Sequence, residues 1–204
     1  MPKGKWGARR IAGACVIALG ALLTINGLWI PAKAVLAQHL LESAWQRTLA
    51  GRPGVSPWPW ADTFPVARLT VGGRAVLVLT DSGGQGLAFG PTHVAGSAVP
   101  GAGGTVVISA HRDTHFRGLD TVKPGATIRL ETPDLKTLHY RVTGSRVLAT
   151  PHLSIPADTR AGRLVLITCW PLDGVVPGRP ERFALFAEEV VSPAASKIKT
   201  SIRR

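Results

Sequence analysis

The pattern of apolar and polar residues in the first quarter of the chain predicts two helical segments. Ile11–Ile30 is an uncharged, largely apolar run of twenty residues, about the length that a helix needs to cross the ~30 Å hydrocarbon core of a membrane. From Lys33 to Ala50, apolar residues recur every three to four positions and polar residues occupy the other face, which predicts an amphipathic helix. The stretch Gly51–Gly54 then ends that helix.

After Pro57–Trp60 the pattern changes to short runs rich in β-branched residues, separated by clusters of Gly, Pro, Asp or Ser. About eight such runs with turn signals between them, and no long helical pattern, favour an all-β barrel or sandwich. The runs are Val66–Val71, Ala75–Thr80, Thr105–Ala110, Ala126–Glu131, Leu138–Val142, Arg146–Leu148, Arg163–Thr168 and Arg182–Val191.

Length and composition fit one folded domain with appendages. A chain of 204 residues suits one domain of ~100–200 residues plus an anchor. The 23 Gly and 16 Pro indicate many turns, but they stay below the ~25–30% that is typical of low-complexity sequences. The expected organisation is a basic tail over 1–10, a transmembrane anchor over 11–30, an amphipathic helix and linker over 31–54, the β domain over 55–192 and a second basic tail over 193–204.

The net charge of +12 is concentrated at the two ends of the chain. Four positive charges lie in the first ten residues and four in the last eight, which leaves +4 for the other 186. The positive and negative charges of the rest of the chain nearly cancel, so the two basic tails do not form a basic binding face. Nucleic acid is therefore not expected as a partner.

The basic N-terminus also predicts the topology of the anchor. Positive residues before a transmembrane helix stay in the cytoplasm, so everything after Ile30 is expected outside it. The alternative is a cleaved signal peptide, because Ala32-Lys33-Ala34 has the form of a cleavage site. The apolar run is longer than the usual ~7–15 residues of a signal peptide, which favours an uncleaved anchor.

Two residues at strand ends are candidates for nucleophilic chemistry. Cys169 follows the apolar run Arg163–Thr168, and His111 follows the apolar run Thr105–Ala110. If Ile11–Ile30 spans a membrane, Cys15 cannot reach Cys169, which is then a free thiol. Taken alone, a cysteine in such a run is more often a small buried hydrophobe, but a histidine at the same rim of a closed sheet could serve it as general acid and base.

Two further features bear on this site: a nearby arginine side chain and a possible metal site. Arg179 and Arg182 follow the cysteine across a Pro/Gly-containing loop, and a guanidinium beside a thiolate could stabilise an oxyanion. His111 and His115 have a helical ligand spacing, but the surrounding residues predict a strand followed by a loop. We therefore expect no metal at this site. Of the two arginines, Arg182 is the better candidate, because it begins an apolar strand that would hold its side chain in place.

These pieces together resemble the sortases, membrane-anchored cysteine transpeptidases with an eight-stranded β-barrel. Val165–Cys169 is similar to the T-L-x-T-C motif of that family, with valine in place of the first threonine. Ala110-His111-Arg112 is similar to the family's histidine motif, and Arg182 matches the arginine of its last strand. The likeness is closest to the branch found in Gram-negative bacteria. It extends over Ala34–Trp45, Pro57–Leu69, Leu87–Val94, His111–Gly118 and Thr168–Arg182.

The resemblance implies a role for each residue of the site. Cys169 is the nucleophile, His111 the general acid and base, and Arg182 the group that stabilises the oxyanion. Thr168, Arg112 and Trp170 are expected in the substrate groove. The substrate is a secreted protein with an LPxTG-like C-terminal sorting signal, the acceptor is an amine that the sequence does not identify, and no cofactor is needed.

Other functions stay open at this point. One is a membrane-tethered, non-catalytic β-barrel that binds a partner, and another is a cysteine peptidase that only hydrolyses its substrate. Papain-like enzymes fit less well, because their cysteine precedes the histidine and begins a helix, whereas His111 precedes Cys169 here and both end strands.

Overall fold

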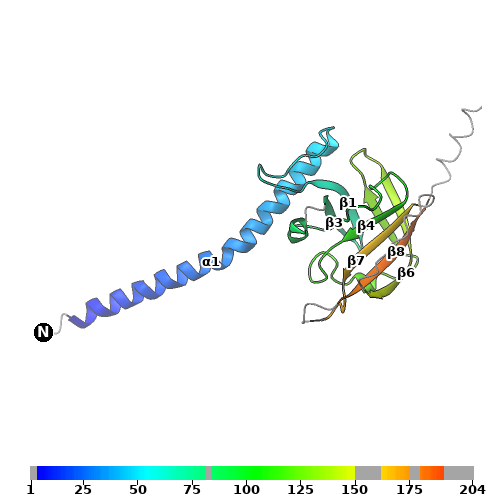
Figure 1. Ribbon diagram of the computed structural model, residues 1–204. Coiled ribbons are helices and arrows are strands. Elements are labelled where there is room, and N and C mark those ends of the chain that lie inside the picture. Colours follow the sequence, from blue (N-terminus) through cyan, green and yellow to red (C-terminus); the bar gives the residue numbers. More distant parts are fainter. Residues whose placement is uncertain (1–3, 81–83, 150–161, 175–179, 191–204) are drawn as a thin grey trace, which may run out of the picture. The chain divides into compact units, whose positions relative to one another are not determined.

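The computed structural model describes residues 4–80, 84–149, 162–174 and 180–190. The chain divides into two compact units, Met1–His39 and Leu40–Arg204. Figure 1 shows the long helix α1 and the strands of the second unit coloured along the sequence. The sequence-predicted boundaries at residues 10, 30, 54 and 192 remain predictions, and the second basic tail lies outside the described residues.

Helix α1 (Gly4–Leu49) contains both of the helical segments that the sequence predicts, and Pro31 lies inside it. Its N-terminal part is apolar around its whole circumference, with side chains such as Ile17 and Ile30 about three-quarters exposed. Among the described residues it is the one helix long and apolar enough to cross a membrane, with a mean hydropathy of 2.1 in its most apolar window. Such a surface is typical of a helix with apolar surroundings.

The last turns of α1 belong to the second unit and pack against it. Leu41, Ala44, Trp45 and Thr48 are at most 4% exposed, and their spacing puts them on one face of the helix. Beside this face, the Arg68 Nη2 atom lies 2.6 Å from the Glu42 carboxylate. The predicted amphipathic face is therefore used only in part, because Val35 and Leu36, which the same pattern included, are exposed.

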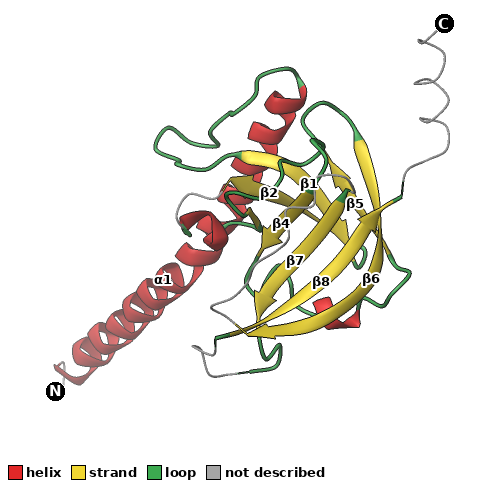
Figure 2. Cartoon of the chain, turned by 45° about the vertical axis from the view of Figure 1, so that its right-hand side comes forward, coloured by secondary structure: helices red, strands yellow, loops and turns green. Residues whose placement is uncertain are grey.

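The second unit is a closed, mixed eight-stranded β-barrel (Figure 2). Its strands follow the order β1-β2-β3-β4-β7-β8-β6-β5 around the barrel, and β5 pairs with β1 to close it. Two neighbouring pairs are parallel, β2 with β3 and β4 with β7, and the others are antiparallel. The strands are β1 (Pro65–Val71), β2 (Arg74–Thr80), β3 (Thr92–His93), β4 (Thr105–Ser109), β5 (Thr127–Glu131), β6 (Thr137–Ala149), β7 (Arg163–Cys169) and β8 (Glu181–Glu189).

The sequence-based expectation of an all-β barrel is confirmed, although two strands differ from it. The runs Leu138–Val142 and Arg146–Leu148 are one strand, β6, whose register with β8 shifts between Val142 and Gly144. The glycine therefore accompanies an irregularity within a strand and not a turn between two strands. The two-residue strand β3 was not predicted, because two residues are too short to show an alternating pattern.

Alternating residues of the central strands pack on opposite faces of the sheet. The larger buried cluster includes Ile108, Leu166 and Leu185. The smaller cluster consists of Val107, Val165, Ile167 and Ala184, with Val94, Leu148 and Phe186 beside it. Each of β4, β7 and β8 thus contributes apolar side chains to both faces of the sheet.

Candidate active site

The register of two parallel strands brings His111 level with Cys169. Strands β4 and β7 pair in parallel, with Ser109 opposite Ile167. His111 lies two residues beyond Ser109, and Cys169 lies two residues beyond Ile167. The strands stay together to this point, because the Ala110 amide donates a 3.1 Å hydrogen bond to the Ile167 carbonyl. Residues 58 apart in the sequence therefore come level at the same end of two neighbouring strands.

The antiparallel neighbour on the other side of β7 supplies the arginine. In the pairing of β7 with β8, Cys169 is directly opposite Arg182. Directly opposite residues of an antiparallel pair have Cβ atoms about 4.5–5.5 Å apart. The guanidinium of Arg182 donates a 2.9 Å hydrogen bond to the Glu181 carbonyl, and its side chain is half-buried.

The alternation along the strands places these side chains on one face. Val165 and Ile167 of β7 belong to the smaller cluster, and so does Ala184 of β8. Because successive side chains alternate, Cys169 shares the face of Val165 and Ile167, and Arg182 shares the face of Ala184. The same alternation on β4, continued from Val107, assigns His111 to this face. His111 is exposed and Cys169 is half-buried.

Thr168 points to the other face and joins the two strand ends. Its side chain is 2% exposed, and its hydroxyl donates a 2.7 Å hydrogen bond to the Ala110 carbonyl. The sequence-based prediction placed Thr168 in the groove. Here it lies on the opposite face from Cys169, where its hydrogen bond holds the residue before His111 against the residue before the cysteine.

Arg112 is likewise a buried group, with only 8% of its surface exposed. Its Nη1 atom donates a 2.6 Å hydrogen bond to the Pro171 carbonyl, which ties the loop after β4 to the loop after β7. A 3.3 Å ion pair with Asp113 adds to this contact. The contact joins residues 59 apart in the chain, so no local sequence signal could have indicated it.

Trp170, the third residue predicted for the groove, packs against the larger core cluster. Its indole ring stacks on Phe183, with 6.1 Å between ring centroids and 18° between planes. Its backbone amide donates a 3.3 Å hydrogen bond to the Glu181 carbonyl. The residue stays half-buried and fixes the start of the loop that follows Cys169.

The loop after His111 turns back on itself. The Phe116 amide donates a 3.2 Å hydrogen bond to the His111 carbonyl. Burial and, to a smaller extent, the charge of His111 hold the pKa of His115 below its usual value. His115 was also the second residue of the metal alternative. Among the residues that the structure describes, no three His, Cys, Asp or Glu side chains gather closely enough to hold a metal ion.

The arrangement supplies the groups that nucleophilic acyl transfer requires. The thiol of Cys169 in β7, the guanidinium of Arg182 in β8 and the imidazole of His111, just beyond β4, lie at one end of three adjacent strands. A thiolate can attack a carbonyl carbon, an imidazolium can protonate a leaving amine, and a guanidinium can stabilise the oxyanion between these steps. Arg179, the alternative arginine, lies outside the described residues.

Comparison with known proteins points to one family. A family model for the sortase domain matches residues 70–190, more than half of the chain. None of the curated proteins compared with the chain matches it.

Solved structures share the fold. Sortase C-1 from Actinomyces oris is 24% identical, with 63% of this chain and 75% of that chain covered and a TM-score of 0.56. Sortase A from Corynebacterium diphtheriae is 23% identical, with 77% and 86% covered and a TM-score of 0.56. A Clostridium perfringens sortase D5 transpeptidase is 17% identical, with 77% and 99% covered and a TM-score of 0.59. At these identities the likeness concerns the fold.

Proposed function

The chain belongs to the sortase family of cysteine transpeptidases, and on this premise we propose that it cleaves the LPxTG-like C-terminal sorting signal of a secreted protein and joins that protein to an amine. The branch found in Gram-negative bacteria, which the sequence motifs resemble, is part of the proposal.

In the proposed mechanism, the Cys169 thiolate attacks the carbonyl carbon before the glycine of the signal. The Arg182 guanidinium stabilises the tetrahedral oxyanion. The carbon–nitrogen bond then breaks, and His111 donates its proton to the departing glycine amine. The product is a thioester between Cys169 and the substrate protein, which an amine acceptor resolves.

One observation carries this proposal. Cys169 ends β7, His111 lies at the same level two residues beyond the end of the parallel strand β4, and Arg182 is the cross-strand partner of the cysteine. This placement supports a direct role for all three side chains. The positions of Thr168 and Arg112 support an indirect role, because Thr168 joins the residues before His111 and Cys169, and Arg112 ties the loop after β4 to the loop after β7.

The N-terminal part of α1 is proposed to anchor the enzyme in the cytoplasmic membrane. Its length and apolar character support a single span, and the basic residues 1–10 support a cytoplasmic N-terminus. The catalytic barrel is then outside the cytoplasm, where secreted substrates carry their sorting signals. The proposal includes an uncleaved anchor.

The test uses the full-length chain in detergent with a peptide that contains an LPxTG-like signal. Intact-mass spectrometry should detect a covalent adduct whose mass equals the acyl half of the peptide, and the adduct should disappear when an amine is added. Cys169→Ala should abolish the adduct, whereas Cys15→Ala, which changes the other cysteine of the chain, should form it at the wild-type rate.

Three results would contradict the proposal or part of it. An adduct in Cys169→Ala would remove this thiol from the mechanism. Equal rates in wild type and Arg182→Ala would remove the arginine, since loss of an oxyanion donor costs about 10²–10³ in rate. Release of the free acid at the same rate with and without amines would favour a peptidase that only hydrolyses its substrate.

A further inference from the structure

The face of the sheet that carries Cys169 continues over β7, β8 and β6 as a regular grid of side chains. Directly opposite residues of an antiparallel pair share a face, and every second residue of a strand returns to that face. The two registers give three successive rows across β7, β8 and β6: Cys169, Arg182 and Leu148; then Ile167, Ala184 and Arg146; then Val165, Phe186 and Gly144. Arg146 is therefore one row away from the candidate site.

Side-chain contacts place Arg146 on the same face. Its guanidinium carbon lies 4.8 Å from the centroid of the Phe186 ring. Phe186 and Leu148 both pack against the smaller cluster, which belongs to this face. The Arg146 side chain is exposed, and the attraction between a cation and an aromatic ring holds its charge above an apolar surface.

Arg146 has no counter-charge in the part of the chain that the structure describes, because it forms no ion pair there. On β8, the acidic residue of this face is Glu188, which lies opposite Arg163 on β7 and Arg141 on β6. Glu188 is four residues beyond Ala184, about 13 Å along the strand. An exposed guanidinium without a carboxylate partner can bind an acidic side chain of a ligand through two parallel hydrogen bonds.

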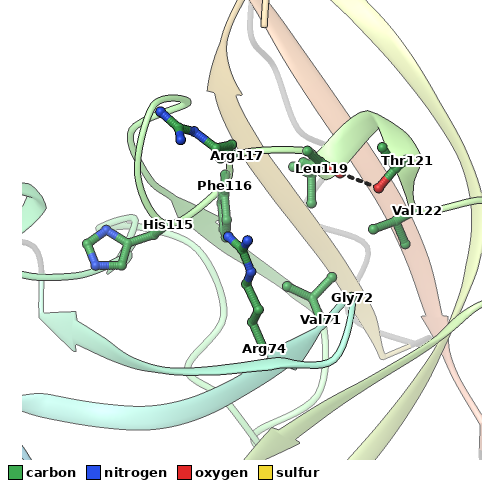
Figure 3. Close-up of a pocket in the computed structure, with 10 residues that line it drawn as sticks. Val71, Gly72, Arg74, His115, Phe116, Arg117, Leu119, Thr121 and Val122 are labelled. Atoms are coloured by element: carbon green, nitrogen blue, oxygen red, sulfur yellow. Dashed lines mark hydrogen bonds between the residues drawn. The ribbon is translucent and has the colours of Figure 1, made fainter.

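A cavity of about 250 Å³ near the site does not belong to this surface (Figure 3). Figure 3 shows Arg74 of the β1–β2 hairpin on one side of it, and His115 and Phe116 of the loop after His111 on the other. No residue of the three rows lines the cavity. Strands β8 and β6 lie on the side of β7 opposite to β4, so the grid extends from Cys169 away from His111.

The order of the proposed catalytic groups indicates which half of the substrate crosses the grid. Cys169 is level with His111 on one side and opposite Arg182 on the other. In the proposed mechanism His111 protonates the departing glycine amine, which puts the leaving half of the signal on the β4 side. The acyl half extends from the same carbonyl carbon in another direction, over β8 and β6.

The distance between Cys169 and Arg146 selects a position in the acyl half. Arg146 is two strands and one row away, so the two Cα atoms are about 12 Å apart, given ~4.8 Å between strands and ~6.6 Å between rows. An extended peptide advances ~3.3 Å per residue and covers about 13 Å in four residues. In an LPxTG-like signal, the residue four positions before the threonine is the one that precedes the leucine.

We propose that Arg146 binds an acidic side chain at the residue before the leucine of the sorting signal, so that the enzyme prefers substrates with aspartate or glutamate at that position. This inference rests on the proposed transpeptidase function. It deepens that function, because it adds a charged feature of the secreted substrate to the LPxTG-like pattern and assigns it to one side chain.

The test compares peptides that contain LPQTG and differ only in the residue before the leucine, which is glutamate, glutamine or lysine. The full-length enzyme in detergent reacts with each peptide, and intact-mass spectrometry gives the second-order rate constant of thioester formation. We expect the glutamate peptide to react about fivefold faster than the glutamine peptide at low ionic strength, which corresponds to about 1 kcal/mol. The ratio should fall toward unity in 1 M salt, which screens an exposed ion pair.

Variants assign the preference to Arg146. Arg146→Gln should bring the ratio of glutamate to glutamine rates within about 1.5-fold of unity, and Arg146→Glu should favour the lysine peptide. The ratio is independent of the fraction of folded enzyme, because all peptides meet the same preparation. Arg141→Gln is the matched control, since Arg141 is an exposed arginine of the same strand and lies opposite Glu188. The control should keep the wild-type ratio.

The outcomes separate this inference from the proposed function. No thioester on Cys169 with any of the peptides would overturn the proposed function itself. A thioester that forms equally fast with glutamate and glutamine peptides would overturn only the role of Arg146. A glutamate preference that survives in Arg146→Gln, or that Arg141→Gln removes equally, would assign it to the general positive charge of the chain and would also overturn that role.

Discussion

The hydroxyl of Thr168 donates a 2.7 Å hydrogen bond to the carbonyl of Ala110. These two residues immediately precede Cys169 and His111; Thr168 belongs to β7, and Ala110 directly follows the parallel strand β4. The bond is buried and lies on the opposite face of the sheet from the thiol. It therefore fixes the relative positions of the proposed nucleophile and the proposed acid along their strands from the opposite face of the sheet.

Replacement of Thr168 tests this positioning role. Thr168→Val keeps the shape of the side chain but leaves the Ala110 carbonyl without its donor, which should lower the free energy of unfolding by about 1–3 kcal/mol. We expect the rate of thioester formation to fall with little change in KM. Thr168→Ser restores the hydroxyl and should recover the rate, as measured by urea denaturation and by single-turnover mass spectrometry. Recovery of stability without recovery of rate would show a purely structural role.

Gly174 permits the contact between Arg112 and Pro171. A Cβ atom at this position would lie 2.8 Å from the Pro171 ring and 2.9 Å from the Arg112 Nη1 atom, so Gly174→Ala should displace the buried hydrogen bond between them. We expect a loss of about 1–3 kcal/mol and slower thioester formation. Gly144→Ala is the control, because a Cβ there meets nothing within 4 Å, and it should unfold like the wild type in thermal and urea denaturation.

The pKa of His115 reports on the neighbourhood of His111. Burial is the larger cause of its lowered pKa and the charge of His111 is the smaller. His111→Gln should therefore raise the pKa of His115 only part of the way toward 6.5, the usual value. Titration of the imidazole carbon-bound protons by NMR measures this directly. An unchanged value would place the two rings too far apart to interact.

The same lowered pKa makes stability depend on pH. The pKa of His115 is near 6.5 in the unfolded chain and lower in the folded chain. At a pH between these two pKa values, the unfolded chain therefore binds more protons at His115 than the folded chain does. The free energy of unfolding should therefore fall as the pH drops through about 6.5, and this contribution should level off below the folded pKa. Urea denaturation between pH 8 and pH 5 should show a smaller slope for His115→Gln than for the wild type. Equal slopes would assign the pH dependence to other groups.

Trp45 should contribute most to the packing of the last turns of α1. Its side chain is fully buried, whereas Trp29 in the apolar part of the same helix is 58% exposed. Trp45→Ala should lower the free energy of unfolding of the barrel by about 3–5 kcal/mol. Trp29→Ala should change it by much less, as measured by denaturant unfolding of the full chain in detergent. Equal losses would contradict the packing of these turns against the second unit.

Several elements were predictable from the sequence because their signals are local. The apolar run from Ile11 and the periodic stretch after Lys33 predicted helix, and both lie in α1. The alternating runs predicted most strands, from Pro65–Val71 to Glu181–Glu189, to within a residue or two. Where a local signal misled, as at Gly144 in β6, pairing with β8 kept the strand continuous across the glycine.

The sequence by itself determined the residue types at the candidate site, because a cysteine and a histidine that end apolar runs, followed by an arginine that begins one, can be recognised from neighbours in the chain. Only the tertiary structure decided their alignment. The parallel pairing of β4 with β7 and the antiparallel pairing of β7 with β8 set the levels of His111, Cys169 and Arg182, and such registers depend on contacts between residues far apart in the chain. For the same reason Thr168 and Arg112, expected in the substrate groove, are buried and bonded to the loops and strand ends around the site.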